Sequence, residues 1–174
     1  RTSSNEHSAG LYLANVAALV PMAKDPSYVD ALLEHCARHT IGMIIPILDV
    51  EAEALAPQAM RFVAAGVHLA VNPAACVAAS NDKRISFEVC EKHGIPQPRR
   101  YDTPAAAPAS DYPLIGKPIR GVGATGIVEL ERPDPGRLTG LDPRDYIWQR
   151  FIRGDEFSID TFGDPGSERF VAVP

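Results

Sequence analysis

A short apolar strand that ends in a lysine, followed by a glycine-rich loop and a second apolar strand, constrains the fold of this chain more than any other stretch. The segment runs from Pro113 to Val128 and reads PLIGKPIRGVGATGIV. Lys117 stands before the three glycines at positions 121, 123 and 126. A lysine and a run of backbone N–H groups that converge on one point form a site for a polyphosphate. The segment therefore predicts two strands joined by a phosphate-binding loop.

The glycines fit the pattern G-x-G-x-x-G, which several kinds of loop share. A dinucleotide fingerprint needs a helix directly after the glycines, whereas residues 127–131 alternate apolar and acidic and residues 132–136 form a turn, which predicts a strand. A P-loop needs its lysine after the glycines. The protein-kinase flap also matches, but the chain has no His-Arg-Asp and no Asp-Phe-Gly motif. Two hypotheses remain: a flap that closes over nucleotide phosphates, and an ordinary hairpin with a glycine-rich turn.

A second lysine opens a predicted helix over residues 84–94. Asn81 or Asp82 is the expected N-cap, and Gly94 marks the C-terminal end. Lys83 in the first turn opposes the helix dipole, which is unfavourable unless an anion is bound there. The alternative is a solvated surface lysine.

Residues 146–160 predict an apolar strand, a turn at Gly154 and a second strand on which Glu156, Ser158 and Asp160 alternate. Adenine needs an apolar slot with backbone donors and acceptors at its edge, and ribose hydroxyls need a carboxylate. One strand–turn–strand segment supplies both. The alternative is a plain β-hairpin with a solvated polar face.

Taken together, these segments resemble the ATP-grasp superfamily, because its elements occur here in the family's order. An Asp-Lys pair at 82–83 opens a helix that ends in Gly-Ile-Pro, a Tyr-Pro-Leu-Ile-x-Lys-Pro strand from 112 to 118 leads into the flap, and a Gln-x-Phe-Ile-x-Gly-x-Glu hinge covers 149–156. The resemblance spans about residues 11–174. It is strongest to the branch shared by carbamoyl-phosphate-synthetase large subunits and stand-alone amino-acid ligases.

The resemblance implies a role for each matching position. Lys83 and Lys117 would contact ATP phosphates under the loop, Gln149 would lie near the adenine amino group with the following backbone at the base edge, and Glu156 would hold the ribose hydroxyls. Family loops often carry serine where Ala124 stands, so one hydroxyl donor is absent while the backbone N–H remains. The implied cofactor-binding residues are Lys83, Lys117, Gly121, Gly123, Ala124, Thr125, Gly126, Gln149, Arg150, Phe151, Ile152 and Glu156.

The implied activity is that of an ATP-dependent ligase, in which a carboxylate becomes an acyl phosphate and an amine or similar nucleophile displaces the phosphate. ATP and Mg²⁺ are the implied cofactors, small-molecule carboxylates and amines the substrates, and a homodimer is compatible. The family's metal ligands have no match in this sequence, so no catalytic or metal residue is expected here and the chain is expected to be an inactive piece of a longer enzyme. A nucleotide-binding module without catalysis and a structural α/β domain are the alternatives.

The expected fold class is α/β. The resemblance divides the chain into a partial Rossmann-like pre-ATP-grasp domain (1–80), a helix and Pro/Ala-rich linker (81–108), a small α+β lid subdomain (109–152) and the start of a large ATP-grasp subdomain (153–174). An edge strand is expected at 99–101 and a short helical turn at 142–145.

Helix and strand alternate in the N-terminal part. A helix that opens at Asp25-Pro26, strands at 43–47 and 67–71, and a helix from 49 to 65 that stops at Gly66 predict right-handed crossovers and a doubly wound parallel sheet. Asp49 and Glu51 follow the first strand, where they would cap the helix or meet a substrate. The apolar face of the first helix carries Tyr28, Leu32, Leu33 and Cys36.

Composition excludes several functions. The 174 residues are 45% hydrophobic, which supports a packed core, and a net charge of −5 argues against a nucleic-acid partner. Cys36, Cys76 and Cys90 are odd in number and far apart, so a reducing cytoplasm is expected. His35 and His39 stand four residues apart but have no third metal ligand. No apolar run reaches the ~18 residues of a membrane span, and the first residues are not a secretory signal.

Overall fold

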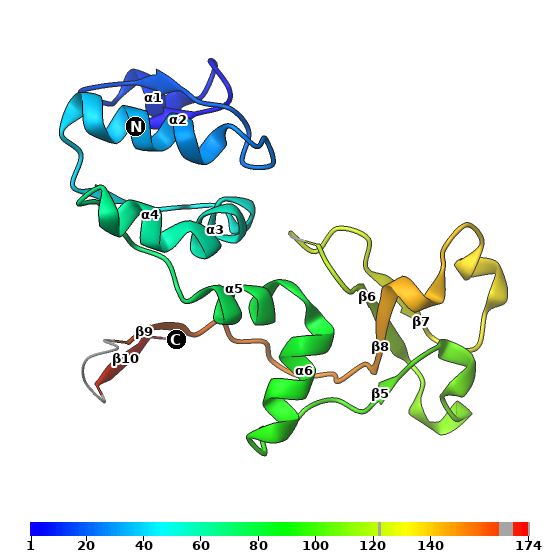
Figure 1. Cartoon of the computed structure of the whole chain (residues 1–174). Helices are drawn as coiled ribbons and strands as arrows, with labels where there is room; N and C mark the ends of the chain where they lie inside the picture. Colours follow the sequence, from blue (N-terminus) through cyan, green and yellow to red (C-terminus); the bar gives the residue numbers. More distant parts are fainter. Residues whose placement is uncertain (122, 164–168, 174) are drawn as a thin grey trace. The chain divides into compact units, whose positions relative to one another are not determined.

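The computed structural model describes residues 1–121, 123–163 and 169–173 (Figure 1). Val122, in the middle of the predicted loop, lies outside the described residues. The chain forms two compact units. The first comprises Arg1–Gln97 and Ile119–Thr125, and the second comprises Pro98–Pro118 and Gly126–Pro174. The predicted phosphate loop therefore belongs to the same unit as the helix that carries Lys83, although the strands on either side of it belong to the other.

The first unit contains short parallel strand pairs and six helices among its described residues. Strand β1 pairs with β2, and β3 pairs with β4, both in parallel. The chain passes from β3 through two helices to β4, which confirms the predicted βαβ alternation, although each strand is only two residues long. The two pairs are separate sheets among the described residues, so one continuous doubly wound sheet stays a prediction. The elements are β1 Thr2–Ser3, α1 Ala9–Tyr12, β2 Ala18–Leu19, α2 Tyr28–His39, β3 Met43–Ile44, α3 Asp49–Leu55, α4 Ala59–Ala64, β4 His68–Leu69, α5 Ala74–Asn81 and α6 Lys83–Lys92.

The predicted helix over residues 49–65 is interrupted. It consists of α3 and α4, with a 3₁₀ turn at Ala56–Gln58 between them. Pro57 has no backbone N–H and its ring crowds the preceding turn, so the α-helical hydrogen-bond ladder cannot continue through it. Gly66, with φ of 71°, ends the second helix as predicted.

One apolar cluster holds the first unit together. It confirms the predicted face of α2, where Tyr28, Leu32 and Cys36 are buried and Leu33 packs against them at the margin. Leu55 and Phe62 are fully buried, because α3 and α4 cover the β3–β4 pair. The buried members are Tyr28, Leu32, Cys36, Leu55, Phe62, Val67 and Leu69.

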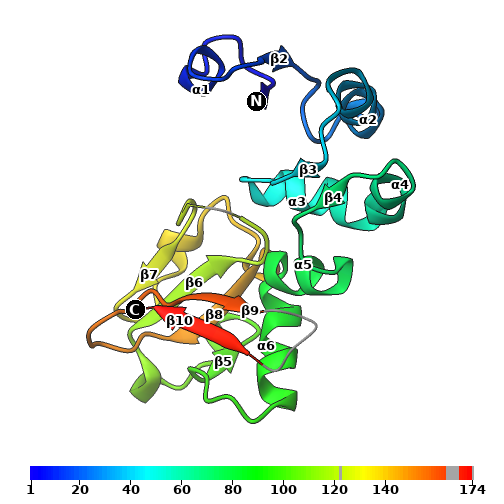
Figure 2. The same cartoon turned by 90° about the vertical axis from the view of Figure 1, so that its left-hand side faces the viewer.

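The second unit is built on a four-stranded antiparallel sheet with the order β5-β8-β6-β7, whose strands can be followed in Figure 2. A separate antiparallel hairpin joins β9 to β10. The structure confirms the two strands around the glycine loop, the edge strand near residues 99–101 and the turn at 142–145. The strands are β5 Arg100–Tyr101, β6 Leu114–Pro118, β7 Val128–Leu130, β8 Tyr146–Arg150, β9 Asp160–Gly163 and β10 Phe170–Val173, and 3₁₀ turns lie at Pro104–Ala106, Ala109–Asp111, Pro135–Leu138 and Pro143–Asp145.

One face of this sheet is packed around Trp148. The indole is fully buried with Tyr101, Leu114 and Leu130, and its Nε1–H donates a hydrogen bond of 3.0 Å to the carbonyl of Pro143. Because Trp148 lies opposite Gly116 in the β6–β8 register, its ring occupies the space above that glycine.

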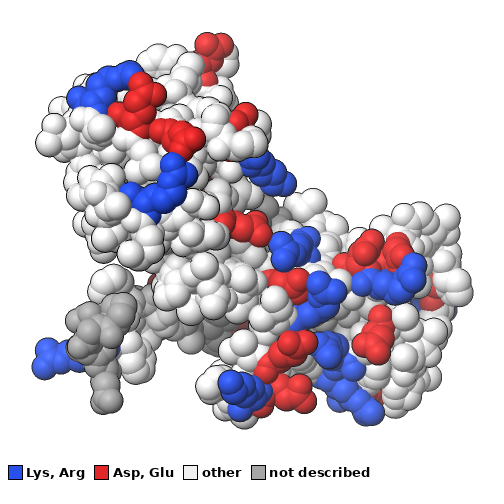
Figure 3. Space-filling view, in the orientation of Figure 1, with Lys and Arg blue, Asp and Glu red and all other residues white. Residues whose placement is uncertain are grey.

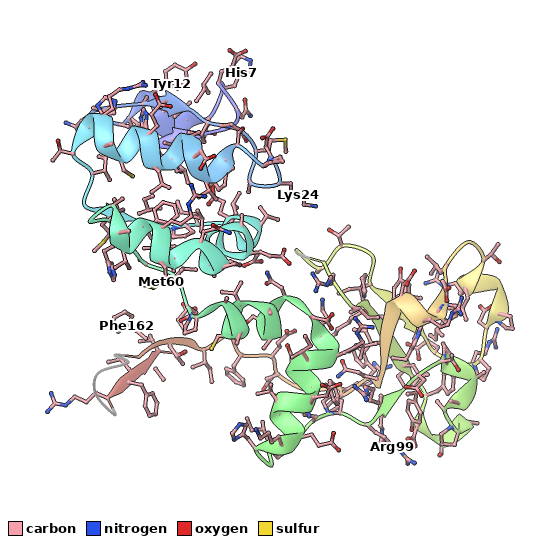
Figure 4. The ribbon with its side chains drawn as sticks, in the orientation of Figure 1. His7, Tyr12, Lys24, Met60, Arg99 and Phe162 are labelled. Carbon is pink, nitrogen blue, oxygen red and sulfur yellow. The ribbon has the colours of Figure 1, made fainter. Side chains whose placement is uncertain are left out.

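Tyr101 and Asp111 form a buried, hydrogen-bonded pair beside the same core. The hydroxyl of Tyr101 donates to the carboxylate of Asp111, and the guanidinium of Arg99, labelled in Figure 4, lies 3.4 Å from that carboxylate. The hydrogen bond from Tyr101 lowers the pKa of Asp111, while burial raises the pKa of Tyr101. Asp111 is therefore held as a carboxylate at the end of the turn that precedes β6. Among the described residues, no helix is both long and apolar enough to cross a membrane.

Candidate functional site

The glycine-rich loop connects two paired strands. Leu114, Ile115 and Gly116 of β6 lie opposite Leu130, Glu129 and Val128 of β7. A strand, not a helix, follows the glycines, which agrees with the rejection of the dinucleotide fingerprint. The backbone φ is positive at Gly123 (64°), Ala124 (56°) and Gly126 (77°). Two consecutive residues with positive φ are typical of a tight turn of the type I′ class, and the described loop residues from Arg120 to Ile127 are all exposed.

The start of α6 lies against the beginning of this loop. The backbone N–H of Lys83 donates a hydrogen bond of 3.1 Å to the carbonyl of Ile119. Of the two predicted N-cap candidates, Asp82 is the N-cap, and its carboxylate accepts from the N–H of Arg84 at 3.0 Å. The first unit therefore brings the Asp82–Lys83 pair and the glycine loop together. The side-chain ammonium of Lys83 has no ion-pair or hydrogen-bond partner among the described residues.

Lys117 and Gln149 share one face of the second unit's sheet. In the antiparallel register, Lys117 lies opposite Ile147, and Ile115 lies opposite Gln149. Directly opposed residues project to the same face and alternate residues return to it. These four side chains therefore lie on the face away from Trp148, and Lys117 and Gln149 are diagonal neighbours. Gln149 is buried, yet no hydrogen bond joins its side-chain amide to another described residue.

Two of the three backbone N–H groups that follow Gln149 already donate hydrogen bonds within the protein. The N–H of Arg150 donates to the carbonyl of Arg99 at 2.9 Å, and the N–H of Phe151 donates to the carbonyl of Pro113 at 2.9 Å. Ile152 is exposed, and its N–H has no partner in the part of the chain that the structure describes. Of these three N–H groups, only that of Ile152 is free to reach the edge of a base.

The predicted strand that carries Glu156 is wrong. Residues 151–159 have no regular secondary structure, Glu156 is exposed, and the strand begins only at Asp160. The reason is that β8 already pairs with β5 on one side and β6 on the other. No edge of β8 is left for a hairpin partner, so β9 pairs with β10 instead. The role of Glu156 toward ribose stays a prediction.

Asp82 is a buried carboxylate surrounded by arginines. Its side chain is 3% exposed, and the guanidinium of Arg84 binds it through Nε at 3.2 Å and Nη2 at 2.9 Å. Nε of Arg120, in the glycine loop, lies 3.5 Å from the same carboxylate. The hydrogen bonds from Arg84 hold the pKa of Asp82 at about 2, although burial acts in the opposite direction.

We expect Asp82→Asn to reveal this carboxylate as a pH-dependent source of stability. The folded pKa of about 2 is below the ordinary value of 3.8, so the stabilisation is complete above about pH 4 and is lost as the pH falls toward 2. Asparagine keeps the N-cap acceptor but not the charge. Urea unfolding at pH 7 should show a loss on the order of 2 kcal/mol for the variant, and the gap between variant and wild type should narrow below pH 4. If the unfolding free energies of wild type and variant differed by the same amount at pH 7 and at pH 2.5, this assignment would be contradicted.

Glu51 confirms the capping interpretation, whereas Asp49 does not. The carboxylate of Glu51 accepts hydrogen bonds from the N–H groups of Ile47 at 3.0 Å and Leu48 at 3.1 Å. Leu48 is the N-cap residue, and Asp49 lies at the first helical position without a side-chain capping bond. The hydroxyl of Tyr28 lies 3.5 Å from Glu51, and burial, with a smaller contribution from that charge, raises the pKa of Tyr28 to about 12.

A cavity of about 480 Å³ lies within the first unit, away from the phosphate-loop residues. Its walls come from β1, β3 and α2, and none of the cofactor-binding residues predicted from the sequence lines it. His35 and His39 do, with ring centroids 4.6 Å apart. Among the described residues no group of three or more His, Cys, Asp or Glu side chains is placed to hold a metal ion.

Arg120 and Gly116 are the residues that sequence reasoning missed. The guanidinium of Arg120 lies 3.0 Å from the carboxylate of Glu53, which is 67 positions away in the chain. Gly116 is fixed by its contact with Trp148. Neither contact leaves a local signal in the sequence, although a glycine inside an apolar strand is a general sign of close approach.

Comparison with known families gives two matches to this chain. A family model described as an ATP-grasp domain matches residues 80–174, which is more than half of the chain. The chain belongs to the ATP-grasp family. A second model, the N-terminal domain of PylC-like proteins, matches residues 2–70. The resemblance inferred from the motifs is therefore confirmed at the level of the family, and so is its α/β fold class.

Solved structures share the ATP-grasp fold with this chain. Biotin carboxylase from Campylobacter jejuni, in a complex with β,γ-ATP, superposes with a TM-score of 0.61 at 14% identity, over 88% of this chain and 39% of its own. L-amino acid ligase from Bacillus licheniformis superposes with a TM-score of 0.56 at 19% identity, over 88% of this chain and 37% of its own. N5-carboxyaminoimidazole ribonucleotide synthetase from Thermus thermophilus superposes with a TM-score of 0.55 at 20% identity, over 92% of this chain and 41% of its own. The chain thus spans about two fifths of these ATP-grasp proteins. A search of curated protein sequences finds no match.

Proposed function

We propose that this chain is the ATP-binding portion of an ATP-dependent ligase that joins a carboxylate to an amine. The observation that carries the proposal is the placement of Lys83 beside the glycine-rich loop, through the bond from its N–H to Ile119, on a chain of the ATP-grasp family. Lys117 leads into the same loop from β6. The similar L-amino acid ligase supports an amine acceptor, and the β,γ-ATP complex of the similar biotin carboxylase supports the nucleotide.

The proposal assigns each part of ATP to a group of residues. Lys83 and Lys117 neutralise phosphate charge, and the N–H groups of Gly121 and of residues 123–126 donate to phosphate oxygens. The amide of Gln149 and the N–H of Ile152 read the base, and the apolar side chains beside Gln149 exclude water. Bound ATP supplies the phosphoryl group that converts the carboxylate into an acyl phosphate.

The remaining details are also part of the proposal. Residues 109–152 act as a lid that covers the phosphates and protects the acyl phosphate from water. Glu156 binds the ribose hydroxyls from the irregular segment after β8. The described residues supply no cluster of metal ligands, so no step is assigned to Mg²⁺ within them. A reducing cytoplasm and a homodimer stay predictions.

The proposal is tested by nucleotide binding and turnover. Isothermal titration should show that the protein binds ATP more tightly than adenosine, because the site is built around the phosphates. ADP formation should then be assayed with Mg²⁺ and a panel of amino acids, in the longest form of the protein that contains this chain. An affinity for ATP no greater than that for adenosine would refute the phosphate site. Tight ATP binding without ADP formation for any carboxylate–amine pair would favour a binding module without catalysis.

A further inference from the structure

Arg120 is the one arginine of the glycine-rich loop, and the first unit holds it by two carboxylates from distant segments. Its Nη1 lies 3.0 Å from Glu53 on α3, and its Nε lies 3.5 Å from Asp82 at the start of α6. Basic and acidic side chains are interleaved on the face shown in Figure 3. Two acids from separate helices thus converge on a single loop side chain.

The loop is attached to the same helix by its backbone. The carbonyl of Ile119 accepts a hydrogen bond from the N–H of Lys83. Ile119 directly precedes Arg120 in the loop, and Lys83 directly follows Asp82 at the start of α6. The attachment is therefore double: a backbone hydrogen bond and an ion pair join adjacent residues of the loop to adjacent residues of α6. Together they place the beginning of the loop at the helix turn from which Lys83 projects.

The two ion pairs of Arg120 differ in their surroundings. Asp82 is 3% exposed and already binds Arg84, so it is a fixed carboxylate that stays ionised. Glu53 is 49% exposed and Arg120 is 61% exposed, so their pair is open to solvent and salt. Exposed ion pairs are individually weak and are screened by ions. A weak ion pair of this kind, between Arg120 and Glu53, can hold the loop in one position and still break when the loop moves.

We propose that Arg120 is a positioning residue, which ties the glycine-rich loop to the first turn of α6 through Asp82 and to α3 through Glu53. The tie presents the loop N–H groups and the ammonium of Lys83 to a phosphate chain as one preorganised surface. Without it, ordering the loop would have to be paid for when the ligand binds. The inference rests on the proposed function for its ligand, but the tie itself is made by the protein's own side chains.

Hydrogen exchange in the absence of nucleotide tests the tie directly. In Arg120→Gln and in Glu53→Gln, the backbone amide of Lys83, which donates to Ile119, should exchange about three to ten times faster than in the wild type. Arg38→Gln is the matched control, since Arg38 is 60% exposed and pairs with Glu34 on α2, away from the loop. It should leave the exchange rate of the Lys83 amide unchanged. An exchange rate of the Lys83 amide that is unaffected in both Arg120→Gln and Glu53→Gln would overturn the proposal.

Binding of ATP and of adenosine then separates positioning from direct contact. Both variants should weaken ATP binding about three- to tenfold and leave adenosine unchanged, because the loop covers only the phosphates. If Arg120 instead contacted a phosphate itself, Glu53→Gln would release it and ATP binding would not weaken. A loss of affinity in Arg120→Gln alone would therefore overturn the positioning role.

Two further variants complete the test. Arg120→Lys keeps the charge and should restore part of the exchange protection and ATP affinity. The double variant Glu53→Gln/Arg120→Gln should be no worse than Arg120→Gln, because the two side chains act through one contact. A protein that failed to bind ATP in any form would refute the proposed function, whereas the exchange measurement would still decide the tie.

Discussion

Replacing Gly116 with alanine is expected to lower the free energy of unfolding of the second unit by about 3 kcal/mol, the upper part of the usual range for overpacking a core. The new Cβ would lie 2.5 Å from Cζ3 of Trp148, 2.6 Å from Cη2 and 2.8 Å from Cε3. Real Cβ atoms do not approach ring carbons so closely, so either the strand or the ring has to move. The ring has little room, because it is fully buried and its Nε1–H is bonded to Pro143.

Urea unfolding, followed by the fluorescence of Trp148, measures this effect, because the single tryptophan is the side chain that the new Cβ would contact. Gly154→Ala is the matched control in the same unit, since a Cβ at Gly154 meets nothing within 4 Å. It should change the unfolding free energy by less than about 1 kcal/mol. Equal effects of the two substitutions would contradict the packing assigned to Trp148. Because Lys117 follows Gly116 directly, Gly116→Ala should also weaken ATP binding.

Replacing Lys117 with alanine is expected to weaken ATP binding about ten- to hundredfold. A hydrogen bond to a charged group contributes about 1.5–3 kcal/mol, and each 1.4 kcal/mol is a factor of ten in affinity. Lys117 has no ion-pair partner among the described residues and lies on the sheet face opposite Trp148. Its removal should therefore leave the core and the unfolding free energy nearly unchanged.

The controls for Lys117→Ala come from the same chain. Lys24 extends from an exposed loop of the first unit (Figure 4), and Lys24→Ala should not change the affinity. Lys83→Ala should weaken ATP binding to a similar degree, whereas Lys92→Ala, at the other end of α6, should not. The loss should shrink as salt is raised, because ions screen the contact with phosphate. If Lys117→Ala and Lys24→Ala bind ATP equally well, the phosphate site is assigned to the wrong lysine.

The local parts of the candidate site could be predicted from the sequence because their causes are local. An aspartate before an apolar repeat and a glycine after it predict α6 with its N-cap Asp82 and its end near Gly94, and the structure has both. Alternating residues on either side of three glycines predict β6, the loop and β7. These signals depend on capping, on periodicity and on backbone freedom, which involve neighbours within a few residues.

One of the two errors in the predicted elements arose because a strand's partners lie far away in the chain, and the other had a local cause. The strand expected at Glu156 did not form, because β8 has no free edge, and nothing within residues 146–160 records that β5 and β6 occupy both sides. The helix expected over residues 49–65 was interrupted by Pro57, whose effect is local and could have been included.

The sequence by itself determined the family and the two strands around the glycine-rich loop, and it predicted the phosphate-binding role of Lys83 and Lys117, since each signal is a short run of residue types with its own chemistry. Only the tertiary structure decided that the loop groups with α6 in the first unit while its strands belong to the second, that Lys117 and Gln149 share a sheet face opposite Trp148, and that Glu53 reaches Arg120. The physical reason is that sheet register and ion pairing join residues through space. The free energy of each such contact depends on a partner that sequence spacing does not specify.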